Sequence, residues 1–169
     1  MPVILTADHI AKARGAFEPQ RKNNYTVVID KAGEVIRKAL EKFPFPKESN
    51  DAIVVKFGNE ERKVAGPAKF ENVELVVKDY VDQPVMQKLI AWRKEVYDPA
   101  TGKIGWAKDY KTDGELILSG PDGTTERKWK LQGIWPSALN PGGGDMESGE
   151  PNTASVTLTI DKAVPGQGF

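Results

Sequence analysis

Residue types that build catalytic and metal sites are scarce in this chain. Its 169 residues include no cysteine and a single histidine, His9. The lack of cysteine excludes disulfides, thiol catalysis and cysteine metal sites, and one histidine cannot form a histidine metal cluster within one chain. We therefore expect no enzyme of a familiar class, no metal and no cofactor. His9 is expected to be an ordinary, partly exposed residue of a short N-terminal helix.

The chain also lacks net charge and long apolar runs. It has 24 basic and 24 acidic residues and a pI near 6.6. A chain with this charge balance lacks the excess of basic residues by which proteins bind nucleic acid. No apolar run approaches the length that crosses a bilayer, and Met1–Thr6 lacks the basic segment of a secretion signal. We expect a protein that is kept in the cytosol, or assembled there, without inserting into a membrane.

Two patterns could be mistaken for ligand sites. A glycine run at 142–144 is followed by Asp145, whereas a phosphate loop ends in Gly-Lys-Ser/Thr and leads into a helix. The acidic pair Asp79 and Asp82 lacks the spacing of a calcium loop. Serines are few, and none lies in a Gly-x-Ser-x-Gly turn, so the sequence offers no hydrolase triad. A surface loop and solvated carboxylates account for these patterns.

The segment after Asp82 has the pattern of an amphipathic helix. Asp82 can cap its N-terminus, and Pro84 fits the first turn, where a missing N–H costs nothing. Apolar residues recur at positions i, i+4, i+7 and i+11 of one helical face. They are Val85, Leu89, Trp92 and Val96. This stripe must be buried against the rest of the protein.

Short stretches of β-branched and alternating residues predict a mainly β fold. The predicted strands are 25–30, 35–40, 52–57, 60–64, 70–78, 115–119, 124–132 and 154–162. Helix is the alternative for 34–42, because residues 36–41 include good helix formers. Loops are predicted at 47–51, 98–108 and 137–152. We expect a β-sandwich or partly open barrel with one amphipathic helix packed against it.

The strand over residues 124–132 has two different faces. Trp129 and Leu131 share one face with Arg127, while Lys128 and Lys130 share the other with residues 126 and 132. We expect the tryptophan face to be buried and the lysine face to be exposed to solvent.

The four tryptophans divide into two groups. Trp92 and Trp129 are expected in the core, because each lies on a predicted apolar face. Trp106 and Trp135 flank predicted loops and are candidates for an interface.

A series of short aromatic and glycine motifs runs through residues 24–164. In chain order they are Phe57-Gly58-Asn59, Val64-Ala65-Gly66, the strand Phe70–Leu75, Ala91-Trp92, Tyr110-Lys111, Gly114-Glu115-Leu116, Trp129-Lys130-Leu131 and Trp135-Pro136. Together with the strand order, they resemble the tail-tube protein of contractile-tailed bacteriophages. That family is related in fold to the tubes of type VI secretion and of phage-tail-like injection particles.

The resemblance implies a structural role. It implies hexameric rings that form by head-to-tail contact, with strands joining between subunits into a tube barrel. The rings stack into a hollow conduit inside a contractile sheath, through which DNA passes during ejection. The implied partners are further copies, the sheath protein, a tape-measure protein in the lumen, baseplate and terminator proteins, and double-stranded DNA in transit. The implied location is the virion tail, after assembly in the host cytoplasm.

Two alternatives remain open at this point. The chain could be the tube subunit of a phage-tail-like bacteriocin, injection particle or secretion system, because these share the fold and the mode of assembly. A monomeric ligand-binding β-sandwich is the alternative of another class.

We predict an N-terminal arm with a short helix (1–22), a single β domain (23–164) and a C-terminal tail (165–169). A lumen for DNA should be neutral or acidic, since a basic wall would bind phosphates. We therefore place the face with Lys128 and Lys130 outward or at a subunit contact.

Ring-to-ring contacts are predicted on the N-terminal arm and on the hairpin with its approach (47–64), because both should project from the body. The predicted contact residues are Ile4, Leu5, Phe45, Lys47, Glu48, Asp51, Glu60, Glu61 and Lys63.

Overall fold

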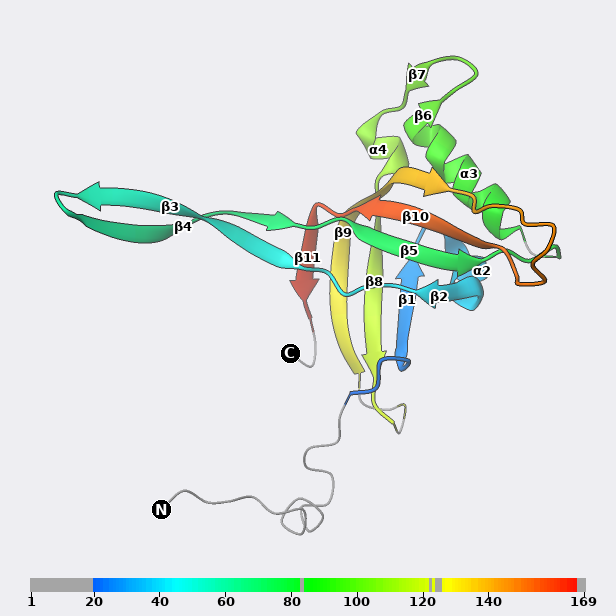
Figure 1. The fold of residues 1–169 in the computed structure, drawn as a ribbon, viewed down its shortest axis with the longest axis horizontal. Coiled ribbons are helices and arrows are strands. Elements are labelled where there is room, and N and C mark those ends of the chain that lie inside the picture. The colour runs from blue at the N-terminus through cyan, green and yellow to red at the C-terminus, as the bar shows by residue number, and fades with distance from the viewer. Residues whose placement is uncertain (1–19, 83, 122, 124–125, 167–169) are drawn as a thin grey trace, which may run out of the picture.

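The structure, a computed structural model, describes residues 20–82, 84–121, 123 and 126–166. Within these ranges a seven-stranded sheet folds into two crossing layers, and a long hairpin projects to one side (Figure 1). The predicted N-terminal helix and the last three residues lie outside the described residues. The prediction of a mainly β, open-sheet fold with a packed helix is confirmed.

One long strand, β9, belongs to both layers. Sheet A has the order β11, β9, β8, β1, and sheet B has the order β9, β10, β5, β2. All of these neighbours pair antiparallel. The bounds are β1 Tyr25–Ile29, β2 Leu40–Lys42, β5 Val73–Lys78, β8 Thr112–Ser119, β9 Glu126–Asn140, β10 Thr153–Thr159 and β11 Lys162–Pro165.

The strand β9 passes from sheet A to sheet B at Gly133. This glycine has a φ of +65°, and its N–H donates to Asp113 Oδ1 at 3.1 Å. The pairing of β8 with β9 shifts register at Asp113. A Cβ on residue 133 would lie 2.2 Å from Asp161 Oδ2. Both the positive φ and the crowding favour glycine at this corner.

The core lies between the two sheets and beneath the helix α3, which spans Val85–Val96. Its buried side chains are Val85, Leu89, Trp92 and Val96, which confirms the predicted stripe. The predicted cap is wrong, because the N-cap is Pro84 and no described side chain bonds to the N-terminus of the helix. The sheets contribute buried apolar residues that include Leu75, Val77, Leu116, Leu131, Val156 and Leu158.

A helix, α2 (Gly33–Ala39), replaces the strand predicted at 35–40. Ile36 and Ala39 are buried and lie three positions apart, as residues on one helical face do. Arg37 and Lys38 occupy the last turn, where cations are favoured by the helix dipole. Only the short strand β2 follows, so the strand prediction is wrong and its helical alternative is right.

Segments predicted as loops partly form regular structure. β9 continues to Asn140, beyond the predicted loop start at 137. Between residues 97 and 110 a small hairpin of β6 (Tyr97–Asp98) and β7 (Lys103–Ile104) precedes the short helix α4 (Ala107–Tyr110). Pro165, predicted as the first residue of the C-terminal tail, pairs with β9 as part of β11.

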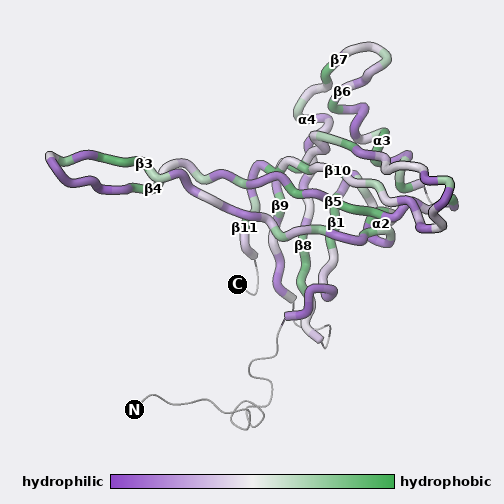
Figure 2. Tube along the Cα trace, viewed as in Figure 1, coloured by the Kyte–Doolittle hydropathy of each residue, from purple (hydrophilic) through white to green (hydrophobic). Residues whose placement is uncertain are grey.

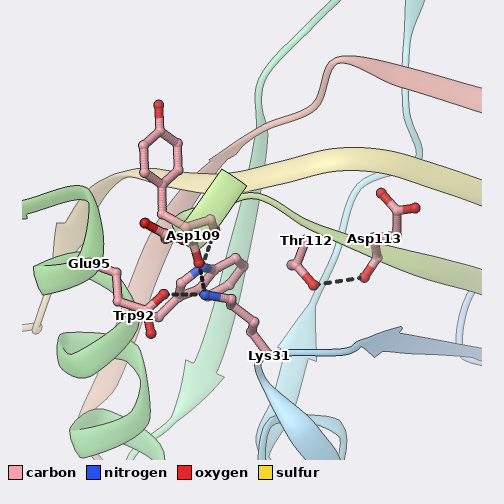
Figure 3. A network of polar contacts seen from close by, with 7 residues as sticks. Lys31, Trp92, Glu95, Asp109, Thr112 and Asp113 are labelled. Atoms are coloured by element: carbon pink, nitrogen blue, oxygen red, sulfur yellow. Dashed lines mark hydrogen bonds and ion pairs between the residues drawn. The ribbon is translucent and has the colours of Figure 1, made fainter. Parts of the chain in front are cut away.

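Polar contacts tie α3 to α4 and to the turn after β1 (Figure 3). The indole N–H of Trp92 donates to the Tyr110 carbonyl at 2.8 Å. The Lys31 ammonium donates to the Glu95 carboxylate and to the Asp109 carbonyl. The helical layer is therefore held to the sheets by directional bonds as well as by packing.

Candidate assembly surfaces

The hairpin of β3 (Glu48–Phe57) and β4 (Glu60–Phe70) extends away from the body (Figure 1). Among the described residues its two strands pair only with each other. Nearly all of its residues are exposed. The predicted hairpin is confirmed, but it begins earlier than expected, since residues 48–51, predicted as a loop, belong to β3.

The hairpin has one apolar face. Residues opposite one another in an antiparallel pair lie on the same face. The register therefore groups four exposed apolar side chains together, and we call this group the apolar hairpin face: Ile53, Val55, Phe57 and Val64. Arg62 and Glu60 share this face, opposite Val55 and Phe57. Figure 2 shows hydrophobic residues along this part of β3. The other face includes Val54 and the ion pair of Lys56 with Glu61, whose charged atoms lie 3.9 Å apart.

Among the described residues of the subunit, none covers the apolar hairpin face. Phe57 at the tip is 62% exposed. Contiguous exposed apolar surface on a projecting strand pair is typical of an interaction site, and it otherwise invites aggregation. The sequence prediction did not include these four residues among the candidate contacts. Their alternation across the Gly58-Asn59 turn is the signal that identifies them.

The structure places the predicted contact residues at two ends of the hairpin. Ile4 and Leu5 lie outside the described residues. The hairpin root carries Phe45, Lys47, Glu48 and Asp51, and the tip region carries Glu60, Glu61 and Lys63. Lys47 pairs with Glu71 at 3.2 Å, and Asp51 pairs with Lys69. These seven side chains are exposed, and their role as subunit contacts stays a prediction.

An aromatic groove lies at the hairpin root. It has a volume of about 510 Å³ and is lined by Tyr25, Phe43 and Phe45, among others. The Phe45 ring centroid lies 6.4 Å from that of Tyr25 and 5.8 Å from that of Trp129. The Phe43 N–H donates to Tyr25 Oη at 3.1 Å, which fixes the ring beneath it. Trp129 is half-buried and packs against the core, as the sequence predicted.

Sheet A ends in two strands, β1 and β11, that each pair with one neighbour among the described residues. Hydrogen-bonded and non-hydrogen-bonded pairs alternate in antiparallel sheets. Bonds from Ser119 N to Asn24 O and from Asp30 N to Asp113 O therefore direct the backbone groups of Tyr25 and Val27 toward the outer edge, whereas the Ile29 carbonyl accepts from Ala32 N.

The same argument applies to β11. The bond from Gly166 N to Lys128 O directs the backbone groups of Ala163 and Pro165 outward. Pro165 thus places its missing N–H on the edge, where proline is tolerated in a sheet. Each outer strand of sheet A therefore presents backbone groups that a further strand could bond.

The face of sheet A that points away from the core bears lysines. Its charged side chains include Lys128, Lys130 and Lys162, with Glu115 directly opposite Lys130. The register places these residues on the face opposite Leu131 and Trp129. The prediction that the lysine face is exposed to solvent and the tryptophan face is buried agrees with this arrangement.

A second exposed apolar feature lies beyond α3. Ile104 and Trp106 are 79% and 76% exposed. Trp135 instead packs its ring 5.6 Å from that of Tyr110 and is half-buried. Of the two tryptophans predicted as interface candidates, Trp106 is therefore the accessible one.

The loop after β9 forms a polar groove. It is lined by the glycine run at 142–144 together with Asn140, Ser148 and Asn152. Within the residues that the structure describes, no three acidic or histidine side chains are placed to hold a metal ion. No helix in the described ranges has the length and apolarity needed to span a membrane.

No protein-family model and no curated protein sequence matches this chain. Solved structures do resemble it. The sheath–tube complex of PVC, an extracellular contractile injection system, matches with a TM-score of 0.70 and 17% identity over 96% of this chain and 99% of that one. The cap of the anti-feeding prophage, which terminates its tube, matches with a TM-score of 0.69 and 16% identity over 88% of this chain and 91% of that one.

The tail tube of phage SPP1 matches with a TM-score of 0.55 and 11% identity over 88% of this chain and 79% of that one. These neighbours are structural tube proteins, not enzymes. The predicted resemblance is thereby confirmed at the level of the fold. This chain has the fold shared by phage tail tubes and the tubes of contractile injection systems.

Proposed function

We propose that the chain is the tube subunit of a contractile particle. Copies join into closed rings, the rings stack into a hollow conduit, and a contractile sheath surrounds it. Baseplate and terminator proteins close the two ends. The observation that carries the proposal is the combination of two free edges on sheet A with an exposed apolar hairpin. An isolated subunit would leave both features uncovered, and stacked rings would cover both.

The strand directions of sheet A permit closure. β8 and β11 run one way, while β9 and β1 run the other. When copies are related by rotation about an axis, β11 of one copy meets β1 of the next in the antiparallel sense. Every neighbour in the closed barrel is then antiparallel, and the outward groups of Val27 and Ala163 face a partner strand.

The size of such a barrel suits a conduit. Six copies of a four-stranded sheet give about 24 strands. A strand spacing of about 4.8 Å and a tilt near 40° then give a backbone diameter of roughly 50 Å. The core, sheet B and the helices lie on the other face of sheet A, so in this arrangement they surround the barrel. The exposed apolar pair of Ile104 and Trp106 would then lie outside the wall, on the side of the sheath.

The cargo follows from the lysine face of sheet A, which lines the lumen in this arrangement, whereas we predicted from the sequence that it points outward or lies at a subunit contact. Among its described side chains that face carries Lys128, Lys130 and Lys162 against Glu115 and Asp113, which are alternate residues of β8. A wall with excess lysine attracts phosphates and slows a sliding duplex. The charge pattern therefore favours a phage-tail-like injection particle with a protein cargo. In the second candidate, a phage tail tube, a tape-measure protein first fills the lumen, DNA passes during ejection, and the protein resides in the virion tail after assembly in the host cytoplasm.

Electron microscopy of the purified protein tests the proposal. Negative-stain images at high concentration, with size-exclusion chromatography of the same sample, should show rings or hollow tubes with six-fold end views. A protein that stays monomeric at every concentration, even after a nucleating baseplate is added, would contradict it. The monomeric ligand-binding sandwich would then be the better hypothesis.

A further inference from the structure

We propose that the aromatic groove beside Tyr25 receives residues 165–169 of the next copy around the ring. This proposal rests on the tube function above and names the occupant of the groove. Residues 167–169 lie outside the described residues, so their part in the argument comes from their sequence and from the direction in which β11 leads into them.

The groove has an apolar floor that is ordered and partly open. The Phe43 N–H donates to Tyr25 Oη at 3.1 Å, and the Phe45 ring packs against the rings of Tyr25 and Trp129. Phe45 nevertheless stays 42% exposed. An ordered floor loses little conformational entropy when a side chain enters the groove, so more of the burial contributes to affinity.

Open space continues from the groove toward the outer edge of β1. A second cavity, of about 330 Å³, is lined by Tyr25 and Thr26 together with Arg37 and Leu40. It has no lining residue from β8, the strand on the inner side of β1, so it lies toward the outer edge. Asn23 and Tyr25 line both cavities. The groove is therefore reached from the edge at which β11 of the next copy pairs in the proposed barrel.

The direction of β11 carries the segment past this opening. In the proposed barrel β11 runs antiparallel to β1 of the next copy, so residues later in β11 lie toward Tyr25, the first residue of β1. Pairing Ala163 with Val27 uses both backbone groups of Ala163 and sets Pro165 across from Tyr25. Pairing Ala163 with Tyr25 moves Pro165 to Asn23. In either register the chain after Pro165 passes the residues that open the groove.

Strand spacing selects the next copy over the same copy. Within one subunit β11 and β1 are separated by β9 and β8, which places them about 14 Å apart at the usual spacing. Across the joint between copies they are a single spacing apart, about 5 Å. The groove of the next copy is therefore the nearer one.

The side chains of the segment suit the groove. Pro165 lies directly across from Trp129, on the face of sheet A where Phe45 packs. Residues 167 and 169 follow at intervals of two, so in an extended chain they share this face, and Phe169 lies about 13 Å beyond Pro165. The sequence Pro-Gly-Gln-Gly-Phe has no charged side chain, so it buries no charge against the aromatic floor.

Photocrosslinking tests the contact. The photoreactive residue p-benzoylphenylalanine takes the place of Phe169, and this unlabelled variant is assembled with ¹⁵N-labelled wild-type protein. Irradiation should link position 169 to labelled peptides that contain Tyr25, Phe43 or Phe45. The same residue in place of Trp106, which is 76% exposed, is the control and should give no link to the groove.

Alanine variants give an independent measurement. Phe169→Ala should raise the concentration needed for assembly about tenfold, because it removes the largest apolar side chain of the segment. Phe45→Ala should raise it as well. In the Phe45→Ala background, Phe169→Ala should add less than about threefold, since the two side chains share one contact. Circular dichroism of each variant checks that the fold of the subunit persists.

The outcomes separate this contact from the tube proposal. If tubes form but position 169 links outside the groove, links only within one copy or gives no link, the contact is overturned and the tube proposal stands. If position 169 links to the groove of a second copy in assemblies without a lumen, the contact stands and the tube proposal fails. If concentrated protein gives neither assembly nor a link between copies, both fail.

Discussion

Val54 and Val55 are consecutive residues of β3 whose side chains lie on opposite faces of the projecting hairpin. Val55 belongs to the apolar hairpin face with Phe57, whereas Val54 lies opposite Lys63 on the mixed face. The two valines are similarly exposed: Val54 is 45% exposed and Val55 is 37% exposed. They are therefore a matched pair for asking which face is buried on assembly.

Val55→Asp should prevent or strongly weaken ring stacking, because it places a carboxylate in the apolar contact. Arg62 lies directly across from residue 55, but an ion pair buried in the contact still loses its hydration, so the concentration needed for assembly should rise by at least about tenfold. Sedimentation velocity over a concentration series measures this threshold.

The control is Val54→Asp, which changes the same residue type one position away. It should shift the threshold by less than about threefold, since its carboxylate stays in water; Lys63 lies across from it as Arg62 lies across from residue 55, so the two variants are matched. Equal loss in both variants would mean that both faces are buried, and a loss confined to Val54→Asp would reverse the assignment of the faces.

The lysine face of sheet A makes a prediction about the lumen. Assembled wild-type tubes should bind a short DNA duplex, and the joint replacement of Lys128, Lys130 and Lys162 by glutamine should weaken this binding. The slope of log affinity against log salt should become shallower by about 0.9 for each phosphate that the replaced lysines neutralise in the wild-type tube. Fluorescence anisotropy of a labelled duplex against tube concentration measures both quantities.

Three lysines on the outer side give the matched control for that experiment. Lys94, Lys103 and Lys108 are exposed and lie on α3, β7 and α4. Their joint replacement by glutamine should leave the salt slope unchanged. A larger effect from this outer set would mean that sheet A does not line the lumen.

The sequence predicted those parts of the fold whose signal is local. The α3 stripe repeats at helical spacing, and Val73, Leu75 and Val77 alternate toward the core, so both elements follow from periodicity. The short helix α2 is harder to predict, because an apolar residue at each of Ile36 and Ala39 is too little to separate a helix from a strand. Tertiary contacts decide that segment.

The hairpin is predictable only in part, for a different reason. Residues 48–51 are polar and exposed on both faces, so they carry no alternation within the chain. The residues of the apolar hairpin face do alternate along β3, but no described residue of the same subunit packs against them. Sequence patterns indicate burial inside one chain more clearly than burial between copies. Contact residues can therefore be predicted from sequence only by asking which segments project from the body and which carry charge.

Gly133 should be hard to replace, because it combines a positive φ with a crowded Cβ position. Alanine there must keep a φ of +65°, which costs about 1–2 kcal/mol, and its Cβ meets the Asp161 carboxylate. Crowding should add at least another 1 kcal/mol or so. Gly102→Ala is the control, since Gly102 has a φ of +68° and nothing within 4 Å of the added Cβ.

Urea unfolding of the two alanine variants separates strain from crowding. Both should lose stability, and the excess loss in Gly133→Ala reports the clash at the corner. Loss of the same size in both would mean that Asp161 moves aside freely and that β9 does not depend on a close approach at this point.

The bond between Trp92 and Tyr110 should stabilise the subunit without touching any assembly surface. Trp92→Phe removes the indole N–H and leaves the Tyr110 carbonyl without this donor, so the free energy of unfolding should fall by about 1–3 kcal/mol. Trp106→Phe, at a ring that is 76% exposed, should change it by less than about 0.5 kcal/mol. Urea unfolding followed by far-ultraviolet circular dichroism measures both. A fall in assembly for Trp106→Phe with unchanged stability would instead place Trp106 in a subunit contact, whereas unchanged stability in Trp92→Phe would mean that α3 is held by packing alone.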